Sequence, residues 1–486
     1  MPTAVLEGLI RNLAAPAELL IRLIDQHGKD LGSELTSRPL PAPVIDVMLR
    51  HPEREVRSGL AGNLDVDLRI RVRMVDDPDP IVIARVRHDR RKPLPPEAVG
   101  PYLEGFDRVA AGGLLNAREA RQELCLAMAD DRRLVTPAAR HPNPNVRAAA
   151  VFFEQQLTPA DRAALQKDRT EPVRQAFEDR VERATELAEL TPEPGFGRWM
   201  QLGRPLTREV VDHVLAQGDP NDLTVIATNP HAPADAVATL ISHPAPEVRS
   251  AIAHRDDLTA RQVTRLFGDP DPVVRNAISV HPTLTEEERA AMGVDLRHVP
   301  GEGDFGPDCE HSGSWRVDPA WTVEEVTQWA RSSNVLLRRR AARSPELPPA
   351  LVPVLAADGD AGVRILLALH CADAPPHLLL RSYLEYTGCG RDTLLRKPGF
   401  PGAGLARYWR DPDPALRLLV AFDPDAEPSI VDALLYDTDA DVRQAIAASP
   451  QLPPKQVVAL LDDPGLARAA ASNPALPVEV MWQLVN

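Results

Sequence analysis

The densest group of side chains that could bind a metal lies in a Gly- and acid-rich stretch, residues 293–318. Zinc is held by three or four nitrogen, sulfur or oxygen ligands that converge on one point. The run DCEH supplies adjacent donors, but adjacent side chains seldom converge without a specific turn, and the recognised ligand spacings are absent. A solvated acidic loop is therefore the preferred interpretation, and a metal-dependent site is the alternative. The candidate ligands are His298, Asp304, Asp308, Cys309 and His311.

A second group of residues mixes cations with aromatic rings in a Gly-rich stretch near 388–410. Such a mixture suits cation–π or stacking contacts with a ligand, and packing of Arg against aromatic rings within the loop explains it equally well. Both interpretations stay open at this point. The candidate binding residues, with one Trp added from the 293–318 stretch, are Arg391, Arg396, Lys397, Tyr408, Trp409, Arg410 and Trp315.

A third feature is an arginine that recurs about every 26 residues, as when Val248-Arg249 returns as Val274-Arg275. One Arg on each of many stacked neighbours would make a row of like charges that repel one another if left bare. Acids such as Asp269 and Asp271 recur nearby, so a ladder of bidentate Arg–Asp pairs between repeats is the preferred interpretation. A row that binds phosphate is the alternative. The predicted ladder comprises Arg57, Arg147, Arg249, Arg275, Arg338, Arg364, Arg417, Arg443 and Arg468.

Motifs typical of enzymes are absent from the sequence. It contains no GxxxxGK[ST], GxSxG or HExxH run, and its four cysteines, Cys125, Cys309, Cys371 and Cys389, show no CxxC spacing. The aligned histidines precede Pro in repeat corners, where turn and capping roles are typical. We therefore expect no catalytic residue and no cofactor, although catalytic groups could still assemble from distant repeats.

The elements that must position these residues are short helices in pairs. Each repeat carries two apolar triplets at i, i+3, i+4, the spacing that places three side chains on one helical face. Examples are Val237/Leu240/Ile241 and then Val248/Ala251/Ile252, the second starting 11 residues after the first. Most of the 49 prolines fall in corners such as DPDP and HPAP, where proline suits a first helical turn. We expect two helices of about two turns in each repeat.

The repeating pattern xNPxxPxxxVxxLxxDPDPxVRxAIA resembles that of the leucine-rich repeat variant family, whose repeats are similar in kind to HEAT repeats. The resemblance covers roughly residues 15–290 and 318–486. It implies an all-α fold, a right-handed α-solenoid of about seventeen two-helix units, with some helices of the 3₁₀ type. We expect N-terminal repeats over 1–292 with irregular insertions near 88–112 and 176–205, a loop at 293–318, and C-terminal repeats over 319–486.

The charge balance bears on the partner. With 55 Lys+Arg against 70 Asp+Glu the formal net charge is −15, which disfavours nonspecific binding to nucleic acid. The repeats favour a non-catalytic, cytoplasmic scaffold whose concave face binds a protein or peptide. A basic segment of that partner would be attracted by the acidic surface of the scaffold. The alternative is a HEAT-like nucleic-acid-binding protein or DNA glycosylase, which would require a basic concave stripe. No apolar run reaches the length of a membrane span.

Overall fold

Helices joined by tight corners make up the structure. The computed structural model describes residues 3–31, 34–36, 38–86, 94–113, 115–180, 184–193, 195–296, 322–344, 346–388 and 390–486. It is 66% helix, and within these ranges it has no β-strand, so the predicted all-α class is confirmed. Thr185 and Leu206 form an isolated β-bridge.

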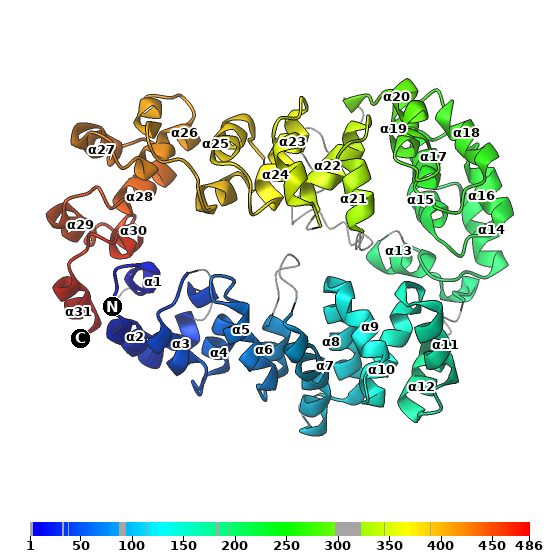
Figure 1. Cartoon of the computed structure of the whole chain (residues 1–486), viewed down its shortest axis with the longest axis horizontal. Helices are drawn as coiled ribbons and strands as arrows, with labels where there is room; N and C mark the ends of the chain where they lie inside the picture. Colours follow the sequence, from blue (N-terminus) through cyan, green and yellow to red (C-terminus); the bar gives the residue numbers. More distant parts are fainter. Residues whose placement is uncertain are drawn as a thin grey trace. The chain divides into compact units, whose positions relative to one another are not determined.

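The first helices, with α for an α-helix and η for a 3₁₀ helix, are α1 Thr3–Arg11, α2 Ala17–Leu31, η1 Glu34–Thr36, α3 Ala42–Met48, α4 Arg54–Ala61, α5 Leu68–Arg71, η2 Val72–Asp76, α6 Pro80–Arg85, α7 Pro96–Ala111, α8 Ala117–Asp130, η3 Arg132–Leu134, α9 Val135–Ala139, α10 Pro144–Ala150, η4 Val151–Gln156, α11 Pro159–Lys167 and α12 Glu171–Arg180 (Figure 1). The middle of the chain forms η5 Leu187–Glu189, α13 Phe196–Leu202, α14 Arg208–Gln217, α15 Pro220–Thr228, α16 Ala234–Leu240, α17 Pro246–Ala253, α18 Ala260–Phe267, α19 Pro272–Ser279, α20 Glu286–Met292, α21 Val323–Trp329, α22 Val335–Arg343, η9 Pro349–Leu351, α23 Val352–Ala356, α24 Ala361–His370, α25 Pro376–Glu385 and η10 Arg391–Arg396. The last helices are η11 Leu405–Tyr408, α26 Pro414–Arg417, η12 Leu418–Phe422, α27 Pro428–Leu434, α28 Ala440–Ala447, α29 Pro454–Leu460, α30 Ala467–Ser472 and α31 Val478–Val485.

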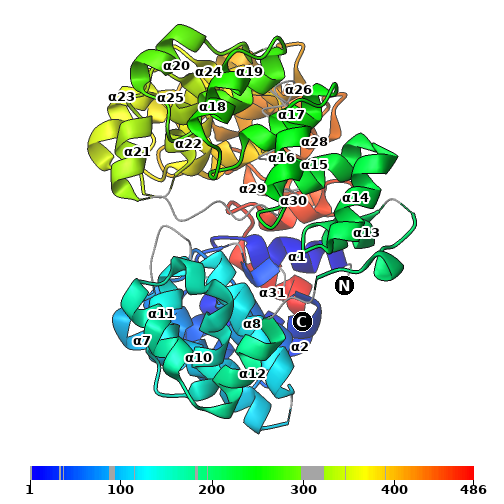
Figure 2. The ribbon, with the colours of Figure 1, turned by 90° about the vertical axis from the view of Figure 1, so that its right-hand side faces the viewer.

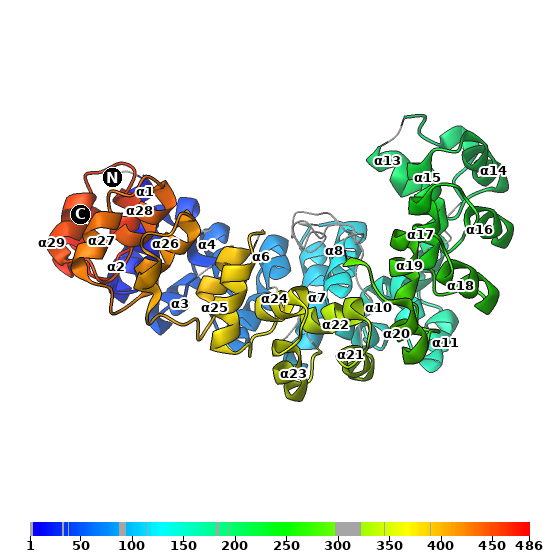
Figure 3. The ribbon, with the colours of Figure 1, turned by 90° about the horizontal axis from the view of Figure 1, so that it is seen from above.

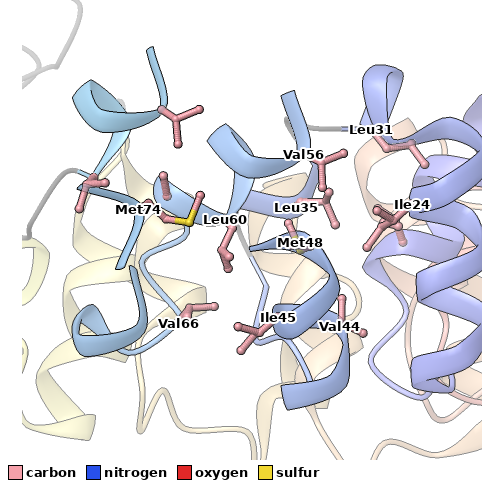
Figure 4. Packing of buried hydrophobic residues seen from close by; sticks show 14 of the residues in the cluster. Ile24, Leu31, Leu35, Val44, Ile45, Met48, Val56, Leu60, Val66 and Met74 are labelled. Carbon is pink, nitrogen blue, oxygen red and sulfur yellow. The ribbon is translucent and has the colours of Figure 1, made fainter. Parts of the chain in front are cut away.

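The apolar triplets form the interior. All six residues of the Val237 and Val248 triplets are buried, five of them on α16 and α17 and Ile241 at the C-cap of α16. Nearer the N-terminus, the buried Ile45 and Met48 of α3 lie beside the buried Val56 and Leu60 of α4 (Figure 4). Helices this short are marginal alone in water, so burial of these faces against neighbouring repeats stabilises them.

Second helices of successive repeats pack on one another. Helix α17 packs against both α15 and α19, and the three follow one another in a row in Figure 3. The pairs α2/α4, α4/α6 and α22/α24 make the same kind of contact. Small residues permit the close approach: Ala251 and Ala277, on α17 and α19, are both buried. The helical repeat character expected from the sequence is therefore present.

The corners are built as the turn chemistry predicts. Asp271 precedes Pro272 at the start of α19, and its carboxylate accepts a hydrogen bond from the Val273 N–H. Asp79 and Asp413 cap α6 and α26 in the same way, each again followed by proline. Proline lacks an N–H and its φ fits a helix, so this position costs the helix no hydrogen bond.

Three of the described helices are about twice as long as the predicted two turns. Helix α2 has 15 residues, α7 has 16 and α8 has 14. No proline occurs between Ala17 and Leu31 or between Ala117 and Asp130, so nothing interrupts α2 or α8. Helix α7 contains Pro101 and continues through it.

The chain forms two compact units. Unit 1 comprises residues 1–178 together with 402–486, and unit 2 comprises residues 179–401. Unit 1 therefore combines the first and last parts of the sequence. The division of the repeats into segments 1–292, 293–318 and 319–486 concerns the interruption of a sequence pattern and stays a prediction. In the part of the chain that the structure describes, no helix is long and apolar enough to cross a membrane.

Candidate functional site

A pocket of about 360 Å³ lies in unit 1 among α7, α8, α10 and α12, which neighbour one another in Figure 2. Its floor includes the buried residues Ala120, Leu124 and Ala148, and polar and charged side chains surround it. A small apolar floor with a few polar groups is typical of a ligand-binding pocket. The lining residues are Asp107, Ala117, Arg118, Ala120, Arg121, Leu124, Asn145, Ala148, Glu171, Pro172 and Gln175.

Local capping fixes the helices that form the pocket. Asn116 caps α8 by accepting hydrogen bonds from the Arg118 and Glu119 N–H groups, and the Glu119 carboxylate accepts one from the Asn116 N–H. This reciprocal capping box orients the first turn, which carries Ala117 and Arg118. Asn143 caps α10 in turn by accepting from the Asn145 N–H.

The Asp107 carboxylate holds two carboxamides at the edge of the pocket. Asn143 Nδ2 donates to Oδ2 over 2.7 Å, and Asn145 Nδ2 donates to Oδ1 over 2.6 Å. Each amide is thereby oriented with its oxygen directed away from Asp107. Both oxygens of the Asp107 carboxylate therefore accept a hydrogen bond from an amide at the pocket edge.

Arg121 lines the pocket and also occupies the recurring arginine position of its repeat. It lies on the 26-residue spacing, one step before Arg147, and its guanidinium stands 5.8 Å from the centroid of the Phe152 ring. In six other repeats an acid 20 or 21 residues later receives such an Arg, but here the residue 20 positions later is His141. Burial lowers the pKa of His141, an effect that Glu104 opposes from 3.5 Å. A neutral imidazole cannot offer Arg121 the bidentate carboxylate found elsewhere.

Most of the predicted ladder arginines donate hydrogen bonds both to the corner of their own repeat and to an acid in the next repeat. Arg249 donates Nη1 to the His243 and Pro244 carbonyls at its own corner, and Nε and Nη2 to both oxygens of Asp269 in the next repeat, over 2.8 and 2.9 Å. The same Arg–acid rungs are Arg57–Asp77, Arg147–Asp168, Arg338–Asp358, Arg364–Glu385 and Arg417–Asp437.

Three predicted ladder residues differ. Arg275 and Arg443 donate Nη1 to the two carbonyls of their own corners, at Asp269 and Pro270 and at Asp437 and Thr438. Arg468 pairs with Glu7 and Glu34, from the opposite end of the sequence.

The ladder shifts the pKa of its carboxyls. Hydrogen bonds from Arg417 hold the pKa of Asp437 below its usual range. Burial alone would raise the pKa of Asp269, but the hydrogen bonds from Arg249 and from the Asp271 N–H outweigh it, and the pKa is lowered. Both corner acids are therefore held as carboxylates.

The predicted binding residues divide between the two units. In unit 2, Arg391 lies with its guanidinium 4.4 Å from the Tyr383 ring centroid and donates Nε to the Tyr383 carbonyl, and Lys397 Nζ donates to the Cys371 carbonyl. Arg396 is exposed. These contacts account for Arg391 and Lys397 by packing and capping within the unit.

In unit 1, the Arg410 guanidinium stacks 4.0 Å from the centroid of the neighbouring Trp409 ring, and Tyr408 receives a hydrogen bond from Arg407 Nη2 on its hydroxyl. Trp315 and the predicted metal ligands His298, Asp304, Asp308, Cys309 and His311 lie outside the described residues. Among the residues that are described, no group of three or more His, Cys, Asp or Glu could hold a metal ion.

Comparison with protein-family models and with curated proteins gave no match. The pocket was not predicted from the sequence because its lining comes from four helices with no shared motif. One sequence signal points to it: Arg121 keeps the repeat spacing, yet His141 stands where its acid is expected.

Proposed function

We propose that the chain is a right-handed α-solenoid of the leucine-rich repeat variant type, and that it acts as a non-catalytic scaffold binding a protein or peptide along its concave face. The observation that carries the proposal is the pocket among α7, α8, α10 and α12. It is formed mainly by second helices of repeats, so these helices line the binding face in this proposal.

The pocket suits one segment of an extended peptide. Ala120, Leu124 and Ala148 offer an apolar floor for a small side chain, while the amides of Asn145 and Gln175 can bond a peptide backbone. The formal net charge of −15 favours a partner whose flanking segments are basic, since opposite charge speeds the encounter of the two molecules.

The test compares two exposed alanines. Ala117 lines the pocket on α8, whereas Ala433 is exposed on α27, outside the pocket lining. The purified full-length protein, and its Ala117→Trp and Ala433→Trp variants, are used to capture partners by cross-linking in lysate. Affinity for the protein that is recovered is then measured with purified components. We expect Ala117→Trp to weaken binding at least about tenfold because the indole fills the pocket, with no change for Ala433→Trp.

Melting temperatures of both variants serve as the folding control. Equal affinity for the partner in both variants would show that binding does not use the pocket. Tight binding of all three proteins to a DNA duplex, in place of a protein, would favour the nucleic-acid alternative and overturn the proposal.

A further inference from the structure

The first helix of the chain packs against one of the last. Helix α1 lies against α30 in unit 1, as Figures 1 and 2 both show. The contact is tight at Gly8: a Cβ placed there would lie 2.6 Å from Cβ of Ala471 and would overlap the Arg468 carbonyl oxygen. Val5, Leu6, Leu9 and Ile10 are buried in the same core. Only glycine permits this approach of the two helices.

A buried asparagine marks the junction between repeats elsewhere in the molecule. Asn473 donates Nδ2 to the carbonyls of Ala447 and Ser449 in the preceding repeat, and its Oδ1 accepts from the Ala475 N–H. Asn229 does the same with the carbonyls of Leu202 and Arg204 and the His231 N–H. Each side chain thereby joins two consecutive repeats through three hydrogen bonds.

Asn12 makes this same junction between the two ends of the sequence. It is fully buried, donates Nδ2 to the carbonyls of Ala471 and Asn473 over 3.0 and 2.7 Å, and accepts from the Ala14 N–H. Its relation to Asn473 is the relation of Asn473 to Ser449, one repeat earlier. Helix α1 therefore takes the place, beside α30, that a following second helix takes in consecutive repeats.

Ion pairs also cross this junction, although the acids are placed differently from those of the ladder. Arg468 occupies the arginine position of α30, and the acids it meets are Glu7 on α1 and Glu34 on η1, at 3.1 and 3.2 Å. Helix packing and the junction asparagine are two independent features of a repeat-to-repeat contact, and both are present between α30 and α1. The Arg468–Glu7 pair adds a charged contact between the same two helices.

We propose that α1 is a clasp. Residues 3–12 dock on α30 as the next second helix, and this docking, which is not covalent, joins residues 402–486 to residues 3–178 as one unit. Helix α31 packs on α2 at the same junction. A helix of nine residues is not stable alone, so α1 is folded only while it is seated. Release of α1 would uncover the apolar face of α30.

The first test enlarges Gly8 and compares it with another helical glycine. Gly8→Ala places a methyl group against α30, whereas Gly100→Ala, in α7, adds a methyl group where no atom lies within 4 Å. We expect amide hydrogen exchange in 467–472 and 478–485 to speed up about tenfold or more in Gly8→Ala and to stay within about twofold in Gly100→Ala. Acceleration confined to α1, or equal in the two variants, would overturn the clasp.

A second pair of variants keeps the proposal testable if Gly8→Ala does not fold. Asn12→Ala leaves the Ala471 and Asn473 carbonyls without this donor, and Asn63→Ala removes the matching donor to the carbonyls of Leu35 and Arg38. Both changes destabilise the protein. Lost exchange protection should spread to 467–485 in Asn12→Ala and centre on 35–63 in Asn63→Ala. The same protection pattern in both variants would refute a separate junction at α1.

Discussion

In two consecutive corners of unit 2, the same turn is built around an imidazole in one and a carboxylate in the other. His243 and Asp269 each begin a corner, and each accepts the N–H two residues on, at 3.2 Å for the imidazole Nδ1 and 2.9 Å for the carboxylate. Each offers its backbone carbonyl to the arginine of its own repeat, Arg249 or Arg275, over 2.7 Å. As turn formers, the two residues are equivalent.

The two corners differ in the side chain that the preceding repeat places beside them. Asp269 receives Arg249, whereas the repeat before His243 carries Leu223 and Thr224 at the corresponding part of α15, and neither is a cation. His51 likewise follows Leu31. The corner residue must accept the N–H two residues on. Asp269 stands where the preceding repeat brings an arginine, and His243 stands where it brings none. His141 is the exception, because it follows Arg121, and Arg121 lines the pocket.

The largest expected effect comes from changing one corner into the other. Asp269→His keeps the turn acceptor but removes the bidentate partner of the largely buried Arg249, so we expect the free energy of unfolding to fall by about 2 kcal/mol. His243→Asp should cost much less, because no arginine is separated from its acid there. Denaturant unfolding of both variants measures this. Equal losses would show that the corner residue acts through the turn alone.

The two corner types should also lose stability in different pH windows. Arg417 lowers the folded pKa of Asp437, so its contribution is present above the unfolded Asp pKa of about 3.9 and is lost as pH falls through the lower folded value. Burial lowers the folded pKa of His141, so stability falls once pH drops below the unfolded His pKa of about 6.5.

The corresponding measurement is the melting temperature against pH. Asp437→Asn should flatten the curve in the acidic window, and His141→Asn should flatten it in the window just below the unfolded His pKa. If His141→Asn instead changed the melting temperature only at the pH values where Asp437 titrates, the assignment of a lowered pKa to His141 would be wrong.

The smallest expected effect concerns the rung at the junction of the two sequence ends. The Arg468 side chain is 45% exposed, against 12% for Arg249. Because water and salt weaken exposed ion pairs, Arg468→Ala should change the free energy of unfolding by no more than about 0.5 kcal/mol. Denaturant titration checks this value. A loss as large as that for Arg249→Ala would mean that the rung, more than Gly8 and Asn12, holds the clasp.

Much of the local structure followed from spacing, while the site did not. The i, i+3, i+4 triplets predicted the buried faces of α16 and α17, and the Pro-containing corners predicted where α19 and α26 begin. The pocket was missed because four helices contribute to it and they share no motif. Arg410 stacks on Trp409, and binding of a ligand by this stretch stays a prediction.

The helices and their corners could be predicted from the sequence, because each depends on residues within one or two turns of each other. Tertiary structure decided which carboxylate each arginine meets, why His141 differs from Asp269, and above all that Asn12 binds the carbonyls of Ala471 and Asn473. That contact joins residues some 460 positions apart. No local spacing encodes this contact, because it is made between the first and the last segments of the sequence, which pack together in unit 1.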